Sequence, residues 1–429
     1  MILGAGISGL ALGWASGLPI YEAEEIPGGI CLSYYMRPGD STRLHQSPED
    51  GESYRFEIGG GHWIFGDNSL IIRFINSLSP LKSYERRSAI YFPDRKLFVP
   101  YPIQHHLSYL GKDVAAKALK EMLVEPKKNA RTMEEWLNAT FGSTLTELFF
   151  GPFHELYTAG LWTQIAPQDP YKSPVSPALA IQGAFDRTEA VGYNARFVYP
   201  EKGLDELVRK MTERCSIHYG KKVVKIDLHK KEVLFEDGSG SRFEILISTL
   251  PLNKVLKMAE VDLGEPDDPY TSVLVLNIGA ERGPYCPDEH WIYLPESKAG
   301  FHRVGFYSNV DATFLPASSR SERTRVSIYV EKAFQGGMSP DSSTIESYKK
   351  DVITELQAWG WIGDVDVVDH TWIDVAYTWS LPGSNWRQKA LKFLEERGVY
   401  QVGRYGRWVF QGIADSIRDG LLAGVVLKD

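Results

Sequence analysis

Apolar positions at helical and strand-like spacing divide the chain into segments, and strand–helix units stand at both of its ends. At the start, a short apolar run over 1–3 precedes a glycine cluster, and the spacing predicts a helix over 7–15 and a strand over 18–22. At the other end, an apolar strand is predicted to end at 402–404, and a helix is predicted over 414–422. These units favour an α/β domain assembled from separated pieces of chain.

A largely helical region is predicted over 66–190, where apolar residues recur at helical spacing. The clearest stretches are Leu70–Leu78, Thr132–Leu137 and Thr144–Leu148. One strand pair is expected to interrupt this region, at Ser88–Phe92 and Lys96–Val99, with its turn at Pro93-Asp94.

Strand-like spacing dominates the second half of the chain. Strands are predicted at Val223–Leu228, Glu232–Phe235 and Phe243–Ser248. Residues 271–332 and 365–377 are also strand-rich, while 341–358 is expected to form a helix.

Length and composition limit the classes of function. With 429 residues, 43% of them hydrophobic, the chain is expected to form two or three domains. A net charge of −8 argues against a nucleic-acid partner, and no apolar stretch reaches the length of a membrane span. Three widely spaced cysteines fit a reducing compartment, so we expect a cytoplasmic protein. Two questions stay open: whether the chain forms a homo-oligomer, and whether the short first strand is clipped or begins upstream.

A glycine motif between the first strand and the first helix predicts a dinucleotide site. The run Gly4-Ala5-Gly6-Ile7-Ser8-Gly9 has the form G-x-G-x-x-G, which lets the backbone and a helix N-terminus approach a pyrophosphate. Glu22 ends the next strand, where a carboxylate can accept hydrogen bonds from ribose hydroxyls. The distance from the motif to Glu22 is shorter than usual, so the first helix must be brief. The candidate cofactor residues at this stage are Gly4, Gly6, Ile7, Ser8, Gly9, Glu22, Gly28 and Gly29.

The segment from Tyr21 to Gly29 resembles the EA-x-x-x-x-GG run of glutathione-reductase-like FAD proteins, which favours FAD over NAD. In such flavoproteins a late strand and helix close over the flavin and its phosphates, and the C-terminal strand and helix predicted here are similar. The resemblance adds Ala23, Val224, Gly403, Arg404, Asp415 and Ser416 to the cofactor candidates.

Further motifs resemble those of UDP-galactopyranose mutases and follow the order of that family. They are the loop Gly59–Phe65 (GG-H-x-I-F), Pro100–Gln104 (PYP-x-Q), Leu161-Trp162, Tyr193–Pro200 (YN-x-x-F-x-YP), Trp291–Tyr293 with Arg303, and Gly403–Trp408 (GR-Y-G-x-W). The resemblance is closer to the eukaryotic-like branch than to the short bacterial one. The wider FAD superfamily also contains amine oxidases and protoporphyrinogen oxidases.

These patterns together predict an α/β protein with a Rossmann-type, glutathione-reductase-like FAD-binding domain, a helical insertion and an antiparallel-sheet domain. We expect the FAD-binding domain to be discontinuous, formed by 1–66, 191–260 and 385–429. Residues 67–190 would form a mostly helical substrate-side domain, whose strand pair over 88–99 joins the sheet domain. The antiparallel-sheet domain would span 261–384.

The resemblance implies a redox-neutral isomerase that interconverts the pyranose and furanose forms of a nucleotide sugar. N5 of reduced flavin would be the nucleophile, with NADPH or NADH as the reductant. The catalytic candidates are His62, Arg303 and Arg404, since arginine has a permanent charge and a donor fork that fits phosphate. Gly60, Gly61 and His62 would contact the flavin. The substrate candidates are Tyr101, Gln104, Trp162, Asn194, Tyr293, Arg303, Tyr377 and Phe410.

One departure from the family pattern keeps other functions open. Phe410 stands where the family commonly has a phosphate-binding tyrosine, and the polar run that usually follows is mostly lost. An FAD-dependent oxidoreductase of the amine oxidase or protoporphyrinogen oxidase type is the main alternative, and a non-catalytic flavin-fold protein is a third. No metal is expected, because the adjacent His105 and His106 would point apart in a helix.

Overall fold

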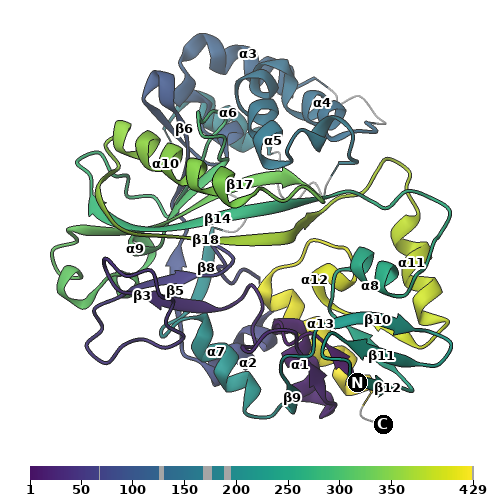
Figure 1. Ribbon diagram of the computed structural model, residues 1–429. Helices are drawn as coiled ribbons and strands as arrows, with labels where there is room; N and C mark the ends of the chain where they lie inside the picture. The colour runs from purple at the N-terminus through teal and green to yellow at the C-terminus, as the bar shows by residue number, and fades with distance from the viewer. Residues whose placement is uncertain (67, 125–129, 168–175, 188–194, 428–429) are drawn as a thin grey trace.

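Two sheets organise the protein: a parallel sheet at one end and a longer, mostly antiparallel sheet through the middle (Figure 1). The structure is a computed structural model that describes residues 1–66, 68–124, 130–167, 176–187 and 195–427. A block of helices lies on the far side of the long sheet from the parallel sheet (Figure 1). The predicted α/β class is confirmed.

The parallel sheet collects short strands from distant parts of the chain, in the order β19-β13-β1-β2-β9. Its strands are β1 (Ile2–Leu3), β2 (Ile20–Tyr21), β9 (Ile217–His218), β13 (Leu246–Ser248) and β19 (Val399–Gln401). Because the carboxyl ends of parallel strands meet at one edge, the segments after β1, β2 and β19 come together there.

Helices α1 (Ile7–Ser16) and α13 (Ile413–Val426) pack against each other beside this sheet. Glycine in α13 permits the close approach, because a Cβ at Gly420 would collide with the Ser8 carbonyl oxygen. The first helix ends at Gly17, whose φ of 74° forms a left-handed cap. The helices predicted at the two ends of the chain are thereby confirmed.

A small antiparallel sheet holds β10 (Val223–Asp227), β11 (Glu232–Phe235) and β12 (Gly240–Arg242). The strand predicted over 243–248 is confirmed only in its second half: Leu246–Ser248 forms β13, while residues 243–245 are not part of a strand. The chain leaves the small sheet at β12 and enters the parallel sheet at Leu246, where β13 begins. Apolar spacing continues through this stretch, so it does not mark where the chain changes its pairing partner.

The long sheet has the order β18-β14-β17-β16-β15-β6-β7, and its neighbouring strands are antiparallel except for the pair β15 and β6. Its strands are β6 (Ser88–Phe92), β7 (Leu97–Pro100), β14 (Tyr270–Arg282), β15 (Trp291–Tyr293), β16 (Arg303–Phe306), β17 (Arg325–Gln335) and β18 (Ile362–Thr378). Helix α10 (Ser342–Ala358) packs on it, and Asp341 caps the helix by accepting from the Thr344 backbone N–H at 2.7 Å.

The predicted helix Leu70–Leu78 is α2 (Ser69–Leu78), which packs beside α13 and not in the helical block. The block contains helices of the rest of the region that was predicted to be largely helical. They are α3 (Lys112–Met122), α4 (Met133–Leu145), the π-helix η4 (Thr146–Phe150), α5 (Gly151–Tyr157) and α6 (Pro177–Phe185). One element was not expected: β5 (Leu81–Glu85) pairs with β8 (Arg196–Pro200). Residues 81–85 have no clear apolar pattern of a strand, and the partner strand lies far along the chain.

The remaining elements connect these layers. They are β3 (Ser33–Met36), β4 (Tyr54–Glu57), α2 (Ser69–Leu78), α7 (Leu204–Thr212), α8 (Leu252–Met258), α9 (Tyr307–Val310), α11 (Trp386–Glu395), α12 (Gly403–Gly406), η1 (Pro93–Arg95), η2 (Ile103–His105), η3 (Leu107–Leu110), η5 (Leu161–Thr163), η7 (Ala312–Phe314) and η8 (Ala317–Ser319). The strand predicted to end at 402–404 ends at Gln401 instead, because Gly403 has a φ of 78° and begins a helical turn.

A helix with the length and hydropathy needed to span a bilayer does not occur in the described ranges.

Candidate functional site

Two glycines of the N-terminal motif have different steric roles. A Cβ at Gly6 would meet no atom within 4 Å, so the backbone there faces open space. A Cβ at Gly9 would collide with the Gly4 carbonyl oxygen, so Gly9 is needed for the strand-to-helix turn itself. Gly6 is also the N-cap of α1, where helix N–H groups are available to an anion. The space beside Gly6 is therefore the natural place for a pyrophosphate.

Glu22 lies just beyond β2, beside the glycine motif. Its Oε2 accepts from the Ala5 backbone N–H at 2.5 Å, and its Oε1 accepts from the Glu24 backbone N–H at 3.0 Å. These bonds hold the carboxylate at the edge of the parallel sheet, next to the glycine motif. Gly4–Gly9 and Glu22 together are called the cradle below. Ala23 is exposed next to it, and Gly28 forms a parallel bridge with Gly6.

The C-terminal candidates lie against this cradle from the other side. A Cβ at Gly403 would collide with the Ser8 hydroxyl, which places the start of α12 directly on the glycine motif. Ser416 is buried in the first turn of α13, and Asp415 pairs with Arg418 at 3.2 Å. Val224 lies on β10 at a register shift and is 48% exposed.

The glycine loop (residues 59–62) is compressed against the long sheet, which explains its composition. A Cβ at Gly60 would lie 2.8 Å from Oε1 of Glu331, and one at Gly61 would collide with the Tyr329 hydroxyl. Gly60 also has a φ of 77°, a conformation that other residues rarely adopt. The loop ends with His62, whose backbone N–H donates to the Gly60 carbonyl at 2.8 Å.

The His62 imidazole is neutral at physiological pH. Burial lowers its pKa to about 4, and the positive charge of Arg404 acts in the same direction. Its Nδ1 is buried and has no hydrogen-bond partner among the described residues. The Nδ1 side of the ring lies against the loop itself, because a Cβ at Gly59 would come within 2.5 Å of this atom.

Arg303 forms a bidentate ion pair with Glu331 across β16 and β17. Its Nε donates to Oε2 at 2.9 Å and its Nη2 donates to Oε1 at 2.6 Å. Burial opposes ionisation of Glu331, but the positive charge of the adjacent Arg303 outweighs this effect and lowers the carboxyl pKa to about 2. Buried His302 lies beside the pair, with Nε2 at 3.5 Å from Glu331 Oε2. Only Nη1 of Arg303 is left outside this pair.

Arg404 is held in place by backbone carbonyls. Its Nη1 donates to Gln411 O at 3.1 Å and its Nη2 donates to Ala376 O at 2.9 Å. The guanidinium lies over the Phe410 ring at 4.6 Å and over the Tyr377 ring at 5.3 Å. Its Nε is buried without a partner in the described part of the chain.

The two arginines lie in one cluster with several tyrosines. Burial raises the pKa of Tyr377, while Arg303 and Arg404 are both close enough to oppose that shift. Tyr293 lies directly opposite Arg303 in the β15–β16 ladder. The Tyr157 ring meets that of Tyr377 at 4.9 Å. Hydroxyl and guanidinium donors from five separate segments therefore surround one region beside the glycine loop.

Tyr157 was missed by the sequence reasoning, as were Glu331 and His302. Tyr157 lies at the end of α5, four residues after Phe153, whose ring it meets at 5.5 Å. An aromatic pair at helical spacing just before Trp162 is the signal that could have identified Tyr157. Glu331 gave no signal, because its role comes from a partner on another strand.

The other substrate candidates do not all lie at the tyrosine cluster. Tyr101 meets the Tyr293 ring at 4.8 Å and so borders the tyrosine cluster. Gln104 is fully buried on η2, and Trp162 donates from Nε1 to Glu155 Oε2 at 2.9 Å. Asn194 lies outside the described residues. His105 and His106 are buried on and beside η2, and no cluster suited to a metal occurs among the residues that the structure describes.

These features fit a bound flavin dinucleotide. Open space beside Gly6 matches a pyrophosphate, and the buried Nε of Arg404 has no partner among the described residues. The fold and the cradle thus define a flavoprotein of the dinucleotide-binding class.

Comparison with known proteins gives the family. The model of the family "Flavin containing amine oxidoreductase" matches residues 18–424, and the chain belongs to this family of flavin-dependent enzymes. FAD is accordingly its cofactor.

Solved structures with the same fold include three informative ones. Reduced UDP-galactopyranose mutase is 21% identical with a TM-score of 0.82, covering 99% of this chain and 94% of the other. A putative protoporphyrinogen oxidase from Exiguobacterium sp. 255-15 is 13% identical with a TM-score of 0.72, covering 100% and 98%. Putrescine oxidase bound to putrescine is 15% identical with a TM-score of 0.57, covering 99% and 98%. At these identities the likeness establishes the fold and leaves the reaction open.

Proposed function

We propose that this protein is a flavin-dependent mutase that interconverts the pyranose and furanose forms of a nucleotide sugar. The observation that carries the proposal is the cluster of Arg303, Arg404 and three tyrosines beside the glycine loop. Glu331 and two backbone carbonyls take up part of the donor capacity of the two arginines. A diphosphate could accept hydrogen bonds from their remaining N–H groups and from the tyrosine hydroxyls.

Each group in the cluster has a role in this reaction. When bound and reduced by NADPH or NADH, the flavin would supply the electron pair for the reaction at the anomeric carbon. As the bond from that carbon to the diphosphate breaks, negative charge grows on the phosphate oxygens, and Arg303 and Arg404 stabilise it. Tyr157 and Tyr377 remain protonated, since burial raises the pKa of each phenol, and they can donate to the same oxygens.

The base and the sugar would lie on opposite sides of the diphosphate. Tyr101, in ring contact with Tyr293, borders the cluster on the side of the helical block and can stack on a planar base. Neutral His62, at the end of the glycine loop, would lie near the sugar and the cofactor. The diphosphate then spans the arginines between them.

An FAD-dependent oxidoreductase is the second candidate, and two observations favour it. Glu331 occupies two of the donor positions of Arg303 and cancels its charge, which weakens the case for a dianionic diphosphate. Phe410 packs on Arg404 where a hydroxyl donor would suit a phosphate. An amine or other small reductant would then be the substrate, with one oxidant consumed in each turnover.

Titration with UDP separates the two candidates. The mutase proposal expects UDP to bind to the FAD-loaded protein, and a nucleotide sugar to isomerise only after one reduction, with no further consumption of reductant. Lack of UDP binding in both redox states would refute the UDP-sugar assignment. Net consumption of an oxidant by a panel of amines, without nucleotide binding, would favour the oxidoreductase.

Arginine-to-lysine variants test the roles of the two arginines, because lysine keeps the charge and loses the fork. Arg303→Lys and Arg404→Lys should each raise the Kd for UDP about 10- to 100-fold, as expected for losing one charge-assisted hydrogen bond. Arg282→Lys is the matched control: the Arg282 side chain is 21% exposed and paired with Asp288, and that of Arg303 is 22% exposed. Equal effects at all three positions would indicate a structural role only.

A further inference from the structure

Asn277 lies near the middle of β14, an interior strand of the long sheet next to the edge strand β18, and is fully buried. Its Nδ2 donates to the Glu57 backbone carbonyl at 2.9 Å and to the Tyr34 hydroxyl at 3.0 Å. Its Oδ1 accepts from the Tyr307 hydroxyl at 3.0 Å. Both the Nδ2 and the Oδ1 atom of Asn277 are thus hydrogen-bonded, and the three bonds reach three different segments of the chain.

The Glu57 carbonyl is the last one of β4 before the glycine loop. It also accepts from the Gly60 backbone N–H at 3.3 Å, and the Tyr307 hydroxyl lies at 3.5 Å from it. The Asn277 amide therefore bonds to the same atom that anchors Gly60. A shift of this carbonyl would move the loop and, with it, the His62 imidazole.

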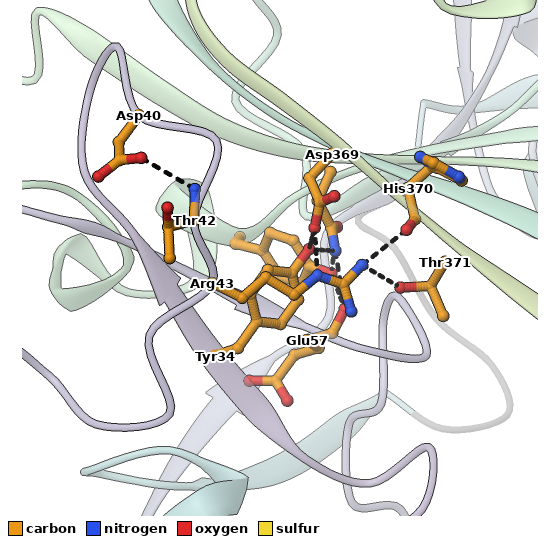
Figure 2. A network of polar contacts seen from close by, with 10 residues as sticks. Tyr34, Asp40, Thr42, Arg43, Glu57, Asp369, His370 and Thr371 are labelled. Atoms are coloured by element: carbon orange, nitrogen blue, oxygen red, sulfur yellow. Dashed lines mark hydrogen bonds and ion pairs between the residues drawn. The ribbon is translucent and has the colours of Figure 1, made fainter. Parts of the chain in front are cut away.

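A chain of polar contacts fixes the orientation of the Asn277 amide. Figure 2 shows the part of this chain formed by Tyr34, Asp369 and Arg43. The Tyr34 hydroxyl accepts from Asn277 and donates to Asp369 Oδ2 at 2.8 Å. Asp369 in turn accepts from Arg43 Nε at 2.6 Å, and Arg43 also donates to the His370 carbonyl at 2.6 Å. Because each hydroxyl has one proton to donate, the Asp369 carboxylate directs the Tyr34 O–H toward itself and leaves its oxygen to accept from Nδ2.

We propose that Asn277 is a positioning residue that holds the glycine loop, and so His62, at a fixed distance from the flavin. The function of the network is to transmit the rigidity of the interior strand β14 to a loop that has three glycines and little stiffness of its own. This inference rests on FAD lying against the glycine loop and does not depend on the mutase reaction.

The test compares two truncations of buried asparagines in the full chain. Asn277→Ala removes the hydrogen bond to the Glu57 carbonyl that precedes the glycine loop. Asn309→Ala is the control, since Asn309 is also buried and its Nδ2 donates to two backbone carbonyls, Pro287 O and Glu289 O, both at 2.8 Å. Both variants should lose thermal stability. Only Asn277→Ala should shift the visible absorption bands and the reduction potential of the bound flavin, and raise the Kd for FAD about tenfold.

Equal flavin spectra, potentials and affinities in the two variants would overturn the proposal. Should Asn277→Ala not fold, Tyr307→Phe gives the same test, because it keeps the ring and removes the hydroxyl that donates to Asn277 Oδ1. His62→Ala checks the premise: an unchanged flavin spectrum there would also overturn the proposal. That outcome leaves the mutase assignment untouched, since UDP binding at Arg303 and Arg404 is measured separately.

Discussion

Substitution of Gly6 by valine should abolish FAD binding without harming the apoprotein. Gly6 has a φ of −67° and a ψ of 174°, an extended conformation that valine adopts readily, and its Cβ direction is open for 4 Å. The free energy of unfolding of the apoprotein should therefore change by no more than about 0.5 kcal/mol. In the holoprotein the valine methyl groups would occupy the place of the pyrophosphate.

Gly9→Ala provides the contrast within the same motif. Its Cβ would collide with the Gly4 carbonyl oxygen, which belongs to the backbone and cannot rotate away. Overpacking of this kind destabilises by about 1–3 kcal/mol or more. Gly9→Ala should therefore lower the stability of the apoprotein, which Gly6→Val should leave intact.

Thermal unfolding with and without FAD distinguishes the two effects. At free FAD of 100 times the Kd, wild-type protein should gain about 2.7 kcal/mol of stability, and Gly6→Val should gain none. Flavin fluorescence quenching gives the affinities directly. A Gly6→Val protein that keeps wild-type affinity, or an apoprotein destabilised as much as Gly9→Ala, would refute the placement of the pyrophosphate.

Two further predictions concern buried carboxyl groups. Burial raises the pKa of Glu57 to about 8, so the folded protein holds a proton that the unfolded chain releases above the ordinary carboxyl pKa of 4.5. Native protein then binds more protons than unfolded protein, and this group lowers stability as pH rises from about 4.5 to about 8, by at most about 1.4 kcal/mol per pH unit. The Tm of Glu57→Gln, measured from pH 5 to 8, should accordingly rise relative to wild type with increasing pH, and a constant difference would contradict the assignment. Glu331→Ala should destabilise the protein by about 3–5 kcal/mol in urea titrations, because it leaves Arg303 largely buried without its carboxylate. Glu213→Ala, which breaks exposed helix pairs, should cost less than about 1 kcal/mol, and similar losses in both would mean that the Arg303 pair is solvated.

Local features of the chain were predictable because their causes are local. Helix α1 and its glycine motif depend on neighbouring residues, and the same is true of α2 and α10 with their side-chain caps at Asn68 and Asp341. The FAD cofactor followed from this kind of information. The division into domains and the roles of individual site residues stay predictions.

The sequence by itself thus determined the dinucleotide cradle, the class of fold and the cofactor, since each depends on short runs of residues with fixed spacing. Tertiary structure alone decided that Glu331 would occupy the fork of Arg303, that Tyr157 would meet Tyr377, and that Asn277 would bond to the carbonyl before the glycine loop. It likewise decided the pairing of β5 with β8 and the change of sheet between β12 and β13. The physical reason is the same in each case: the partners are far apart along the chain, and a hydrogen bond or ring contact between them depends on sheet register and packing, which no local pattern of residues encodes.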